Sequence, residues 1–292
     1  MKKFNKNVYG IVGLRDLNGE VEDSYPIDKL PTLSTNGDLV VNEQLIMYSL
    51  IEYWHNKNMK VFNVATENGI RFYDEYKRYN YLFNDHINRC TGMRLDVLNN
   101  LYGFIDVKNF GLNGYRVFKE YDFNGNLFFG TGFNINNDFK LNEINNSENK
   151  YIADEVHYGF NFQIRPFNII NSMTYGIDFE YSDDDYCILK NSLIENNYSI
   201  GKNMEKEFVI IIECKEKQLL TKHLQTYIKV IKNENSLPEL NIDELIKLCN
   251  DLSDRIDKLE IYFDQSLIEL KLSAEIKQLN YKICTFDQTN EI

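Results

Sequence analysis

Residues 207–232, EFVIIIECKEKQLLTKHLQTYIKVIK, decide the fold of this chain. Their first half contains the most apolar run in the sequence, FVIII at 208–212. A continuous run of mostly β-branched residues has no polar face, so it predicts a strand buried on both sides. In the second half, apolar residues recur at helical spacing from Leu220 to Ile231. This spacing predicts that the buried strand leads into an amphipathic helix.

The composition favours a soluble, acidic protein with a substantial core. Of 292 residues, 43% are hydrophobic and 14% aromatic, which is enough for one large domain or two ordinary ones. The 32 Lys and Arg residues stand against 44 Asp and Glu residues, a formal net charge of −12. Such a charge repels nucleic acid and anionic membranes at long range and favours a basic protein partner.

The five cysteines are far apart without a CxxC motif, and the four histidines form no spaced ligand motif. We therefore expect no disulfide framework, no metal or other cofactor, and a reducing cytoplasm as the setting. No segment approaches the length of apolar sequence that a membrane-spanning helix needs, so we expect no membrane association.

The N-terminal region, residues 1–133, predicts a mixture of helix and strand. We expect strands over 7–14 and 60–65 and a helix over 43–56, where apolar residues recur as a stripe. Asn-Gly pairs are typical of hairpin turns, and we expect such turns at Asn18-Gly19, Asn36-Gly37 and Asn124-Gly125. The Tyr- and Arg-rich segment 70–90 is either a helix packed on a sheet or a base-stacking platform, and its acidic residues favour the helix.

The remaining sequence divides into three regions. Residues 134–150 are rich in Asn and predict an exposed loop or linker. Residues 151–238 predict a β-rich core region that contains the buried strand. Residues 239–292 hold apolar residues at steps of three and four, which favours one long helix or a helical pair over an alternative strand at 266–272. This last region is also acidic, because residues 233–292 contain 13 acidic and 6 basic residues.

Together these patterns predict an α+β fold with a mixed or antiparallel sheet. Hairpin signals outnumber clear βαβ units. The sheet would contain the buried central strand at 208–212 and be followed by an acidic helical region at the C-terminus. An exposed acidic helix with one apolar seam would serve as a contact for a partner or for a second copy of the chain.

One short motif carries a catalytic hypothesis. Glu213-Cys214-Lys215, at the end of the buried strand, resembles the ExK element of the PD-(D/E)xK nucleases. The resemblance implies that Glu213 and an upstream acid, Asp178, hold Mg²⁺ while Lys215 lies beside the scissile phosphate. Strand alternation would place Glu213 and Lys215 on the same face. The alternative interpretation is a strand leaving the core, with these two residues as its first solvated positions.

A second candidate site is the acidic run Asp183, Asp184 and Asp185. It would form either a solvated turn between strands or a contact site for a cation or a basic partner, and we favour the turn.

In size, acidity and Asn-, Lys-, Ile- and Tyr-rich usage, the chain resembles phage-encoded anti-defence proteins, specifically the large inhibitor of the bacterial Gabija system. The resemblance covers the general character of the whole chain and assigns a role to no residue. It implies a non-enzymatic protein of the host bacterial cytoplasm that oligomerises, binds the defence nuclease complex and blocks access of DNA. The alternatives that remain open are the Mg²⁺-dependent nuclease and a structural phage protein.

Overall fold

The computed structural model describes residues 4–22, 31–34, 36–57, 111–112, 115–116, 127–145, 150–165, 183–198, 204–233, 235–277 and 279–287. The chain divides into two compact units that are interleaved along the sequence. The larger unit comprises Lys6–Leu50, Phe129–Gln163 and Leu193–Ile292. It contains nearly all of a ten-stranded sheet, and the features discussed below lie in this unit unless stated otherwise.

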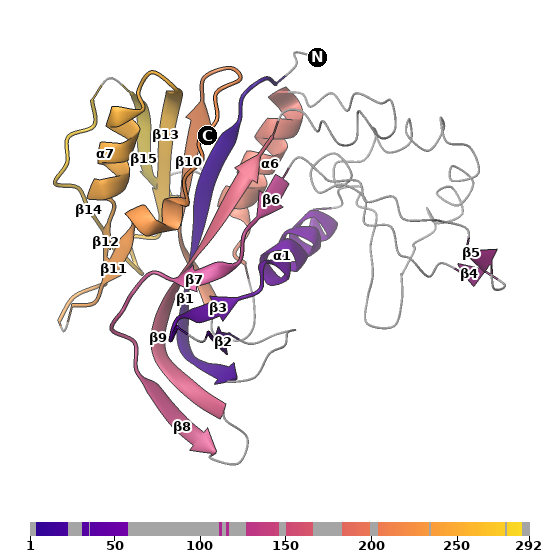
Figure 1. Ribbon diagram of the computed structural model, residues 1–292, viewed down its shortest axis with the longest axis vertical. Helices are drawn as coiled ribbons and strands as arrows, with labels where there is room; N and C mark the ends of the chain where they lie inside the picture. The colour runs from indigo at the N-terminus through magenta and orange to yellow at the C-terminus, as the bar shows by residue number, and fades with distance from the viewer. Residues whose placement is uncertain are drawn as a thin grey trace. The chain divides into compact units, whose positions relative to one another are not determined.

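The strands of the large sheet are ordered β15-β13-β10-β1-β2-β3-β7-β9-β6, with β8 paired to β9 and an additional pairing of β1 with β9 (Figure 1). Most neighbours are antiparallel, whereas β13–β15 and β1–β2 are parallel. The predicted α+β fold with a mixed, largely antiparallel sheet is thus confirmed. Its strands are β1 (Val8–Glu22), β2 (Thr32–Leu33), β3 (Leu39–Val41), β6 (Leu127–Phe129), β7 (Gly132–Asn134), β8 (Leu141–Asn145), β9 (Lys150–Ile164), β10 (Met204–Cys214), β13 (Ile256–Phe263) and β15 (Asn280–Thr285).

Strand β10 is the buried central strand that the apolar run predicts. It lies between β1 and β13, and Ile210 is paired with Ile11 on one side and Ile261 on the other. Its residues from Glu207 to Cys214 are all buried. Because both faces and both edges are covered, a run without polar alternation is the sequence that such a position requires.

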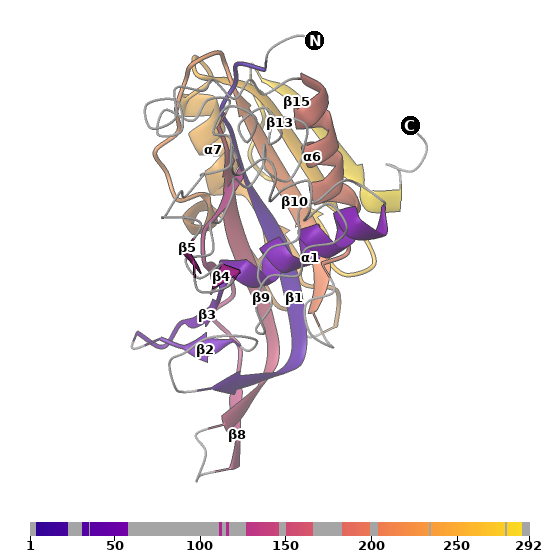
Figure 2. The same cartoon turned by 90° about the vertical axis from the view of Figure 1, so that its right-hand side faces the viewer.

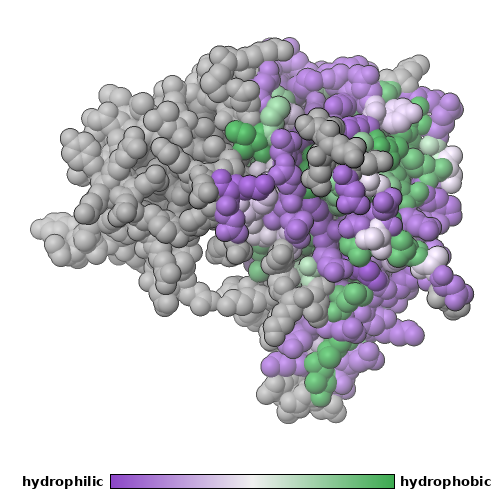
Figure 3. Space-filling model, turned by 180° about the vertical axis from the view of Figure 1, so that it is seen from behind, coloured by the Kyte–Doolittle hydropathy of each residue, from purple (hydrophilic) through white to green (hydrophobic). Residues whose placement is uncertain are grey.

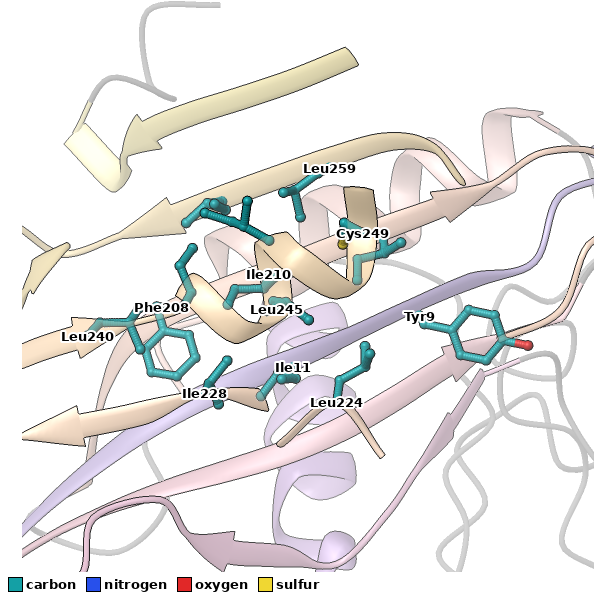
Figure 4. Packing of buried hydrophobic residues seen from close by; sticks show 14 of the residues in the cluster. Tyr9, Ile11, Phe208, Ile210, Leu224, Ile228, Leu240, Leu245, Cys249 and Leu259 are labelled. Atoms are coloured by element: carbon teal, nitrogen blue, oxygen red, sulfur yellow. The ribbon is translucent and has the colours of Figure 1, made fainter. Parts of the chain in front are cut away.

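One face of the sheet is covered by helix α7 (Asp243–Asp251), the short 3₁₀ helix η1 (Leu224–Tyr227) and a three-stranded sheet. The small sheet consists of β11 (Lys229–Ile231), β12 (Glu239–Asn241) and β14 (Glu269–Lys271). Figure 4 shows the hydrophobic core between these elements and the large sheet. It contains Tyr9, Ile11, Phe208, Ile210, Leu224, Ile228, Leu240, Leu245, Cys249 and Leu259.

The opposite face carries the first part of helix α1 (Glu43–Asn56) (Figure 2). Ile46 and Leu50 on this helix are fully buried. The helix matches the predicted range 43–56. Helix α6 (Asp183–Glu195) and the short hairpin of β4 (Gly111–Leu112) and β5 (Tyr115–Arg116) complete the described elements.

The prediction of a helix over residues 220–231 is wrong. The segment contains only the single turn of η1 before strand β11 begins at Lys229. Leu220, Leu224 and Ile228 are nevertheless buried. The segment passes over the sheet, and these three side chains are spaced so that each one is buried. The spacing of the apolar residues therefore comes from burial and not from a helix.

The C-terminal region contains one helix among its described residues, the nine-residue α7, and not the long helix or helical pair that we expected. The steps of three and four continue through Ile256, Leu259 and Phe263, which lie in β13. All three residues belong to, or pack against, the same core cluster. The register shift where Cys214 faces Ile256 adds one residue to β13, which turns part of an alternating pattern into a step of three. Strand β14 lies within the alternative strand at 266–272.

The Asn-rich region 134–150 is a hairpin arm as well as a loop, because β8 pairs with β9 through Leu141 and Ala153. Asn36-Gly37 forms the predicted turn between β2 and β3, with Gly37 at φ 86°. Asn18-Gly19 does not, since β1 continues through both residues. The predicted strand at 60–65, the segment 70–90 and the turn at Asn124-Gly125 lie outside the described residues.

Candidate interaction surface

Helix α7 and the segment that follows β14 form one acidic surface. The carboxylate of Asp243 accepts hydrogen bonds from the backbone N–H groups of Ser273 at 2.8 Å and Ala274 at 2.9 Å. At the other end of the helix, the side chain of Asn250 accepts the N–H of Lys277 at 2.9 Å and donates to the carbonyl of Glu275 at 2.8 Å. The two side chains hold residues 273–277 against α7 as a strap.

The helix, the turn after it and the strap carry four exposed carboxylates and three exposed cations. We call this set the α7 surface, and its members are Glu244, Lys247, Asp251, Asp254, Arg255, Glu275 and Lys277. Lys247 pairs with Glu244, Arg255 with Asp254 and Lys277 with Glu275. The side chains of Glu244 and Glu275 are 65% and 79% exposed. Because Asp243 and Asn250 fix the backbone beneath them, these charges need little reorganisation to meet a partner.

The acidic side chains here belong to a rigid layer over a buried core. Leu245, Ile246 and Cys249 on the inner side of α7 are fully buried. Burial raises the pKa of the Cys249 thiol to about 12, so this cysteine is a packing residue and not a nucleophile. The outer side of the helix is therefore the side available for contact.

A basic loop lies next to the C-terminal end of α7. After β10 ends, every residue from Lys215 to His223 is exposed except Leu220. The N–H of Lys215 donates to the carbonyl of Arg255 at 2.7 Å, and its Nζ donates to the carbonyl of Ser253 at 2.9 Å. This loop carries Lys215, Lys217 and Lys222 against Glu216, so it is a basic segment in a chain that is acidic as a whole.

Glu213 and Lys215, the residues of the ExK hypothesis, have separate structural roles. Glu213 is buried, with its Oε2 atom 3.6 Å from Nζ of Lys6. The register with β13 shifts after Glu213, and Lys215 lies beyond the last residue of β10. Glu213 therefore contacts Lys6, whereas Lys215 is bonded to the turn after α7 at Ser253. Asp178 lies outside the described residues.

The acidic run at 183–185 forms the first turn of α6, in the smaller unit, and not a turn between strands. Acidic residues are favoured at this position because they complement the positive end of the helix dipole. The position of Asp183, Asp184 and Asp185 at the start of α6 is therefore enough to explain why three acidic residues occur together.

A buried charge cluster, which no local sequence pattern reveals, lies where β11 crosses the large sheet. Nδ1 of His157 is 2.8 Å from Oε2 of Glu207, and both side chains are fully buried. Beside them, Arg15 contacts Glu155 at 2.6 Å. Lys232, which follows β11, lies 3.7 Å from Glu155 and 3.5 Å from Asp154. The only related feature of the sequence is that Glu207 directly precedes the apolar run at 208–212. Because that run forms a buried strand, Glu207 enters the core together with it.

Within the described part of the chain, no group of three His, Cys, Asp or Glu side chains is arranged to hold a metal ion. None of the described helices is long and apolar enough to cross a membrane. Figure 3 shows a face on which hydrophilic residues predominate among those described and hydrophobic residues form smaller patches.

No protein-family model and no curated protein matches this chain. Among solved structures, it is similar to a chain of a Csm3–Csm4 subcomplex of the type III-A CRISPR-Cas interference complex, at 10% identity and a TM-score of 0.35. That similarity covers 73% of this chain and 82% of the other. It is also similar to a chain of a CRISPR RNA-guided surveillance complex in a pre-nicking state, at 9% identity and a TM-score of 0.44, covering 94% and 95%. TM-scores below 0.5 do not establish a shared fold.

Proposed function

We propose that this protein is a non-enzymatic binding protein that docks its α7 surface on a basic surface of a protein partner. The observation that carries the proposal is the strap. Asp243 and Asn250 bind residues 273–277 to the helix and so hold exposed carboxylates in a fixed array. Complementary charge accelerates association and selects the partner, and a preformed array loses little conformational entropy on binding.

The partner that we propose is a bacterial anti-phage defence nuclease complex of the Gabija type. Support comes from the likeness of the whole chain to phage anti-defence inhibitors in size, acidity and residue usage. A surface of the nuclease that binds DNA must be basic, and an acidic protein seated on it would compete with DNA for the same charges. The site of action would then be the cytoplasm of the host bacterium.

Binding measurements with a matched pair of variants test this proposal. The first variant neutralises the four carboxylates of the α7 surface: Glu244→Gln, Asp251→Asn, Asp254→Asn and Glu275→Gln. The control neutralises four exposed carboxylates elsewhere: Glu20→Gln, Asp38→Asn, Glu143→Gln and Glu205→Gln. Both change the net charge by the same amount, so long-range attraction changes equally and only the local array differs.

We expect the wild-type protein to bind the purified defence complex and to displace DNA from it. The α7 variant should bind about tenfold or more weakly at about 0.15 M salt, with a flatter salt dependence, and the control about threefold or less. Equal losses for both variants would contradict the assignment of the α7 surface. Absence of any complex with the wild-type protein would contradict the proposed partner.

A further inference from the structure

Strand β15 is an outer strand of the large sheet. Among the described residues, β13 is the one strand that is hydrogen-bonded to it, and the two run in parallel from Lys258 aligned with Asn280 to Phe263 aligned with Thr285. The backbone N–H and C=O groups on the far side of an outer strand form a template that another β-strand recognises. The ligand that fits this edge is therefore an extended segment of polypeptide.

The one charged side chain of β15 turns away from the outer edge. Nζ of Lys282 lies 5.4 Å from the centre of the Tyr262 ring, so its charge leans over the inner neighbour β13. Outer strands commonly carry charges that prevent pairing with other chains. The small sheet follows this rule, because β11 begins with the exposed Lys229 and β14 carries the exposed Glu269 and Lys271. Strand β15 has no comparable protection among its six residues.

Apolar side chains accompany the edge on one face of the sheet. Tyr281 and Ile283 are aligned with Leu259 and Ile261 of β13, which belong to the core beneath α7. Ile283 packs against that core while it remains partly accessible, and Tyr281 is 57% exposed. A further strand beside β15 would cover both side chains, which would add hydrophobic burial to the main-chain hydrogen bonds.

The local charge favours a second β15 as the pairing strand. Residues 279–285, LNYKICT, carry one lysine and no carboxylate, in a chain whose formal net charge is −12. Two β15 strands therefore approach each other without opposing carboxylates. Each of them is already extended and held by β13, so the pairing loses little conformational entropy.

Two-fold symmetry and charge together select one register for two antiparallel β15 strands. Side chains that lie directly opposite each other share a face, so the symmetry axis passes beside a residue and not between two residues. An axis at Lys282 would place two lysines opposite each other, which is unfavourable. An axis at Ile283 places Ile283 opposite its own copy and Lys282 opposite Cys284. This register aligns residues 281–285 of the two copies, the longest overlap that keeps the lysines apart.

We propose that β15 pairs with β15 of a second copy of this chain about a two-fold axis at Ile283, which joins the two large sheets into one. Each copy supplies the strand that the other lacks, so the contact closes on itself and stops at the dimer. Because each chain carries a net charge of −12, long-range repulsion opposes the contact, and added salt strengthens it by screening that repulsion.

Sedimentation velocity of the full-length protein tests the pairing. At about 100 μM protein we expect a species of twice the chain mass of 34.5 kDa, in larger proportion at about 0.5 M salt than at about 0.05 M. Ile283→Lys adds two like charges at the axis and should weaken the dimer about tenfold or more. Ile231→Lys, at a 45% exposed position on the outer strand β11, is the matched control and should weaken it about threefold or less.

Disulfide trapping reads the register without disturbing the charge. In a background with Cys187→Ser and Cys284→Ser, Ile283→Cys should form an intermolecular disulfide on mild oxidation, because the two substituted positions face each other. Tyr281→Cys should form far less, since position 281 faces position 285, and the background protein measures trapping through the remaining cysteines.

A mass of one chain at both salt concentrations would overturn the proposal. A dimer that is equally stable in wild type and Ile283→Lys would do so as well, because β15 would not be the contact. Equal trapping at Ile283→Cys and Tyr281→Cys would also overturn it, because no single register would then exist.

Discussion

The carboxylate of Asp243 accepts the backbone N–H of Ala274 at 2.9 Å, which ties the segment after β14 to the first turn of α7. This bond, followed by those from Ser273, holds the pKa of Asp243 below its ordinary value. A lowered pKa contributes stability that is present above the pKa of the unfolded state and is lost as the pH falls through the folded value. The strap is thus fastened at neutral pH and loosens in acid.

Replacement of Asp243 by Ala should release the strap. We expect a loss of about 1 kcal/mol in the free energy of unfolding at pH 7, because two hydrogen bonds to a charged but solvent-accessible acceptor disappear. The difference from wild type should shrink toward pH 3, as measured by urea denaturation at each pH. Glu244→Ala, one residue along and exposed, is the matched control and should leave the stability nearly unchanged.

Asp16 lies buried in β1, and burial raises the pKa of its carboxyl to about 6. A raised pKa contributes stability that is present below the unfolded value and is lost as the pH rises through about 6. Asp16→Asn removes the ionisation and should be more stable than wild type at pH 8, by up to about 3 kcal/mol. Thermal melts at pH 5 and pH 8 check this, and an equal effect at both pH values would contradict it.

Gly10 in β1 has no space for a side chain. A Cβ atom there would lie 2.2 Å from the carbonyl oxygen of Ile210 and 2.3 Å from the ring of Phe162. We expect Gly10→Ala to cost about 3 kcal/mol or more, because both neighbours belong to buried strands of the large sheet. Gly130→Ala is the control, since its Cβ would meet nothing closer than 3.9 Å. Similar melting temperatures for the two variants would contradict this prediction, because they would show that β1 can shift to make room for the added methyl group.

The nuclease alternative has its own test. Nζ of Lys215 donates to a backbone carbonyl at 2.9 Å and Glu213 contacts Lys6, so we expect no Mg²⁺-dependent nicking of plasmid DNA by the wild-type protein. Lys215→Ala should leave partner binding and stability near wild type, because the side chain is exposed. Nicking by the wild-type protein that disappears in this variant would restore the enzyme hypothesis.

The sequence predicted the parts of the fold in which local pattern and burial agree. The apolar run at 208–212 and the stripe over 43–56 are long enough to specify one structure each, and both predictions are confirmed as β10 and α1. The predictions failed where burial alone spaces the apolar residues. Ile256 and Leu259 in β13 belong to the same core cluster, and the register shift between β10 and β13 inserts one extra residue between them, so their step of three imitates a helix.

The buried charge cluster was beyond sequence reasoning for a different reason. His157 and Glu207 are 50 residues apart, and neither lies in a spaced motif. They meet only because β9 and β10 are both brought beside β1. The acidic character of residues 233–292 was visible in the sequence. Its presentation on a short helix and a strap depends on Asp243 and Asn250, whose partners follow 25 or more residues later in the chain.

The pairing of β1 with β10 sets the order in which this protein can be completed during synthesis. Val8 is aligned with Glu213, and Lys258 then closes the other side of Glu213. A ribosome must therefore release more than two hundred residues before β1 can pair with β10, although its other partners, β2 and β9, are made earlier. During that interval β1 presents an apolar edge to the cell, and such delayed long-range pairing makes folding slow and exposes the nascent chain to aggregation. Chaperone dependence during expression is the practical consequence.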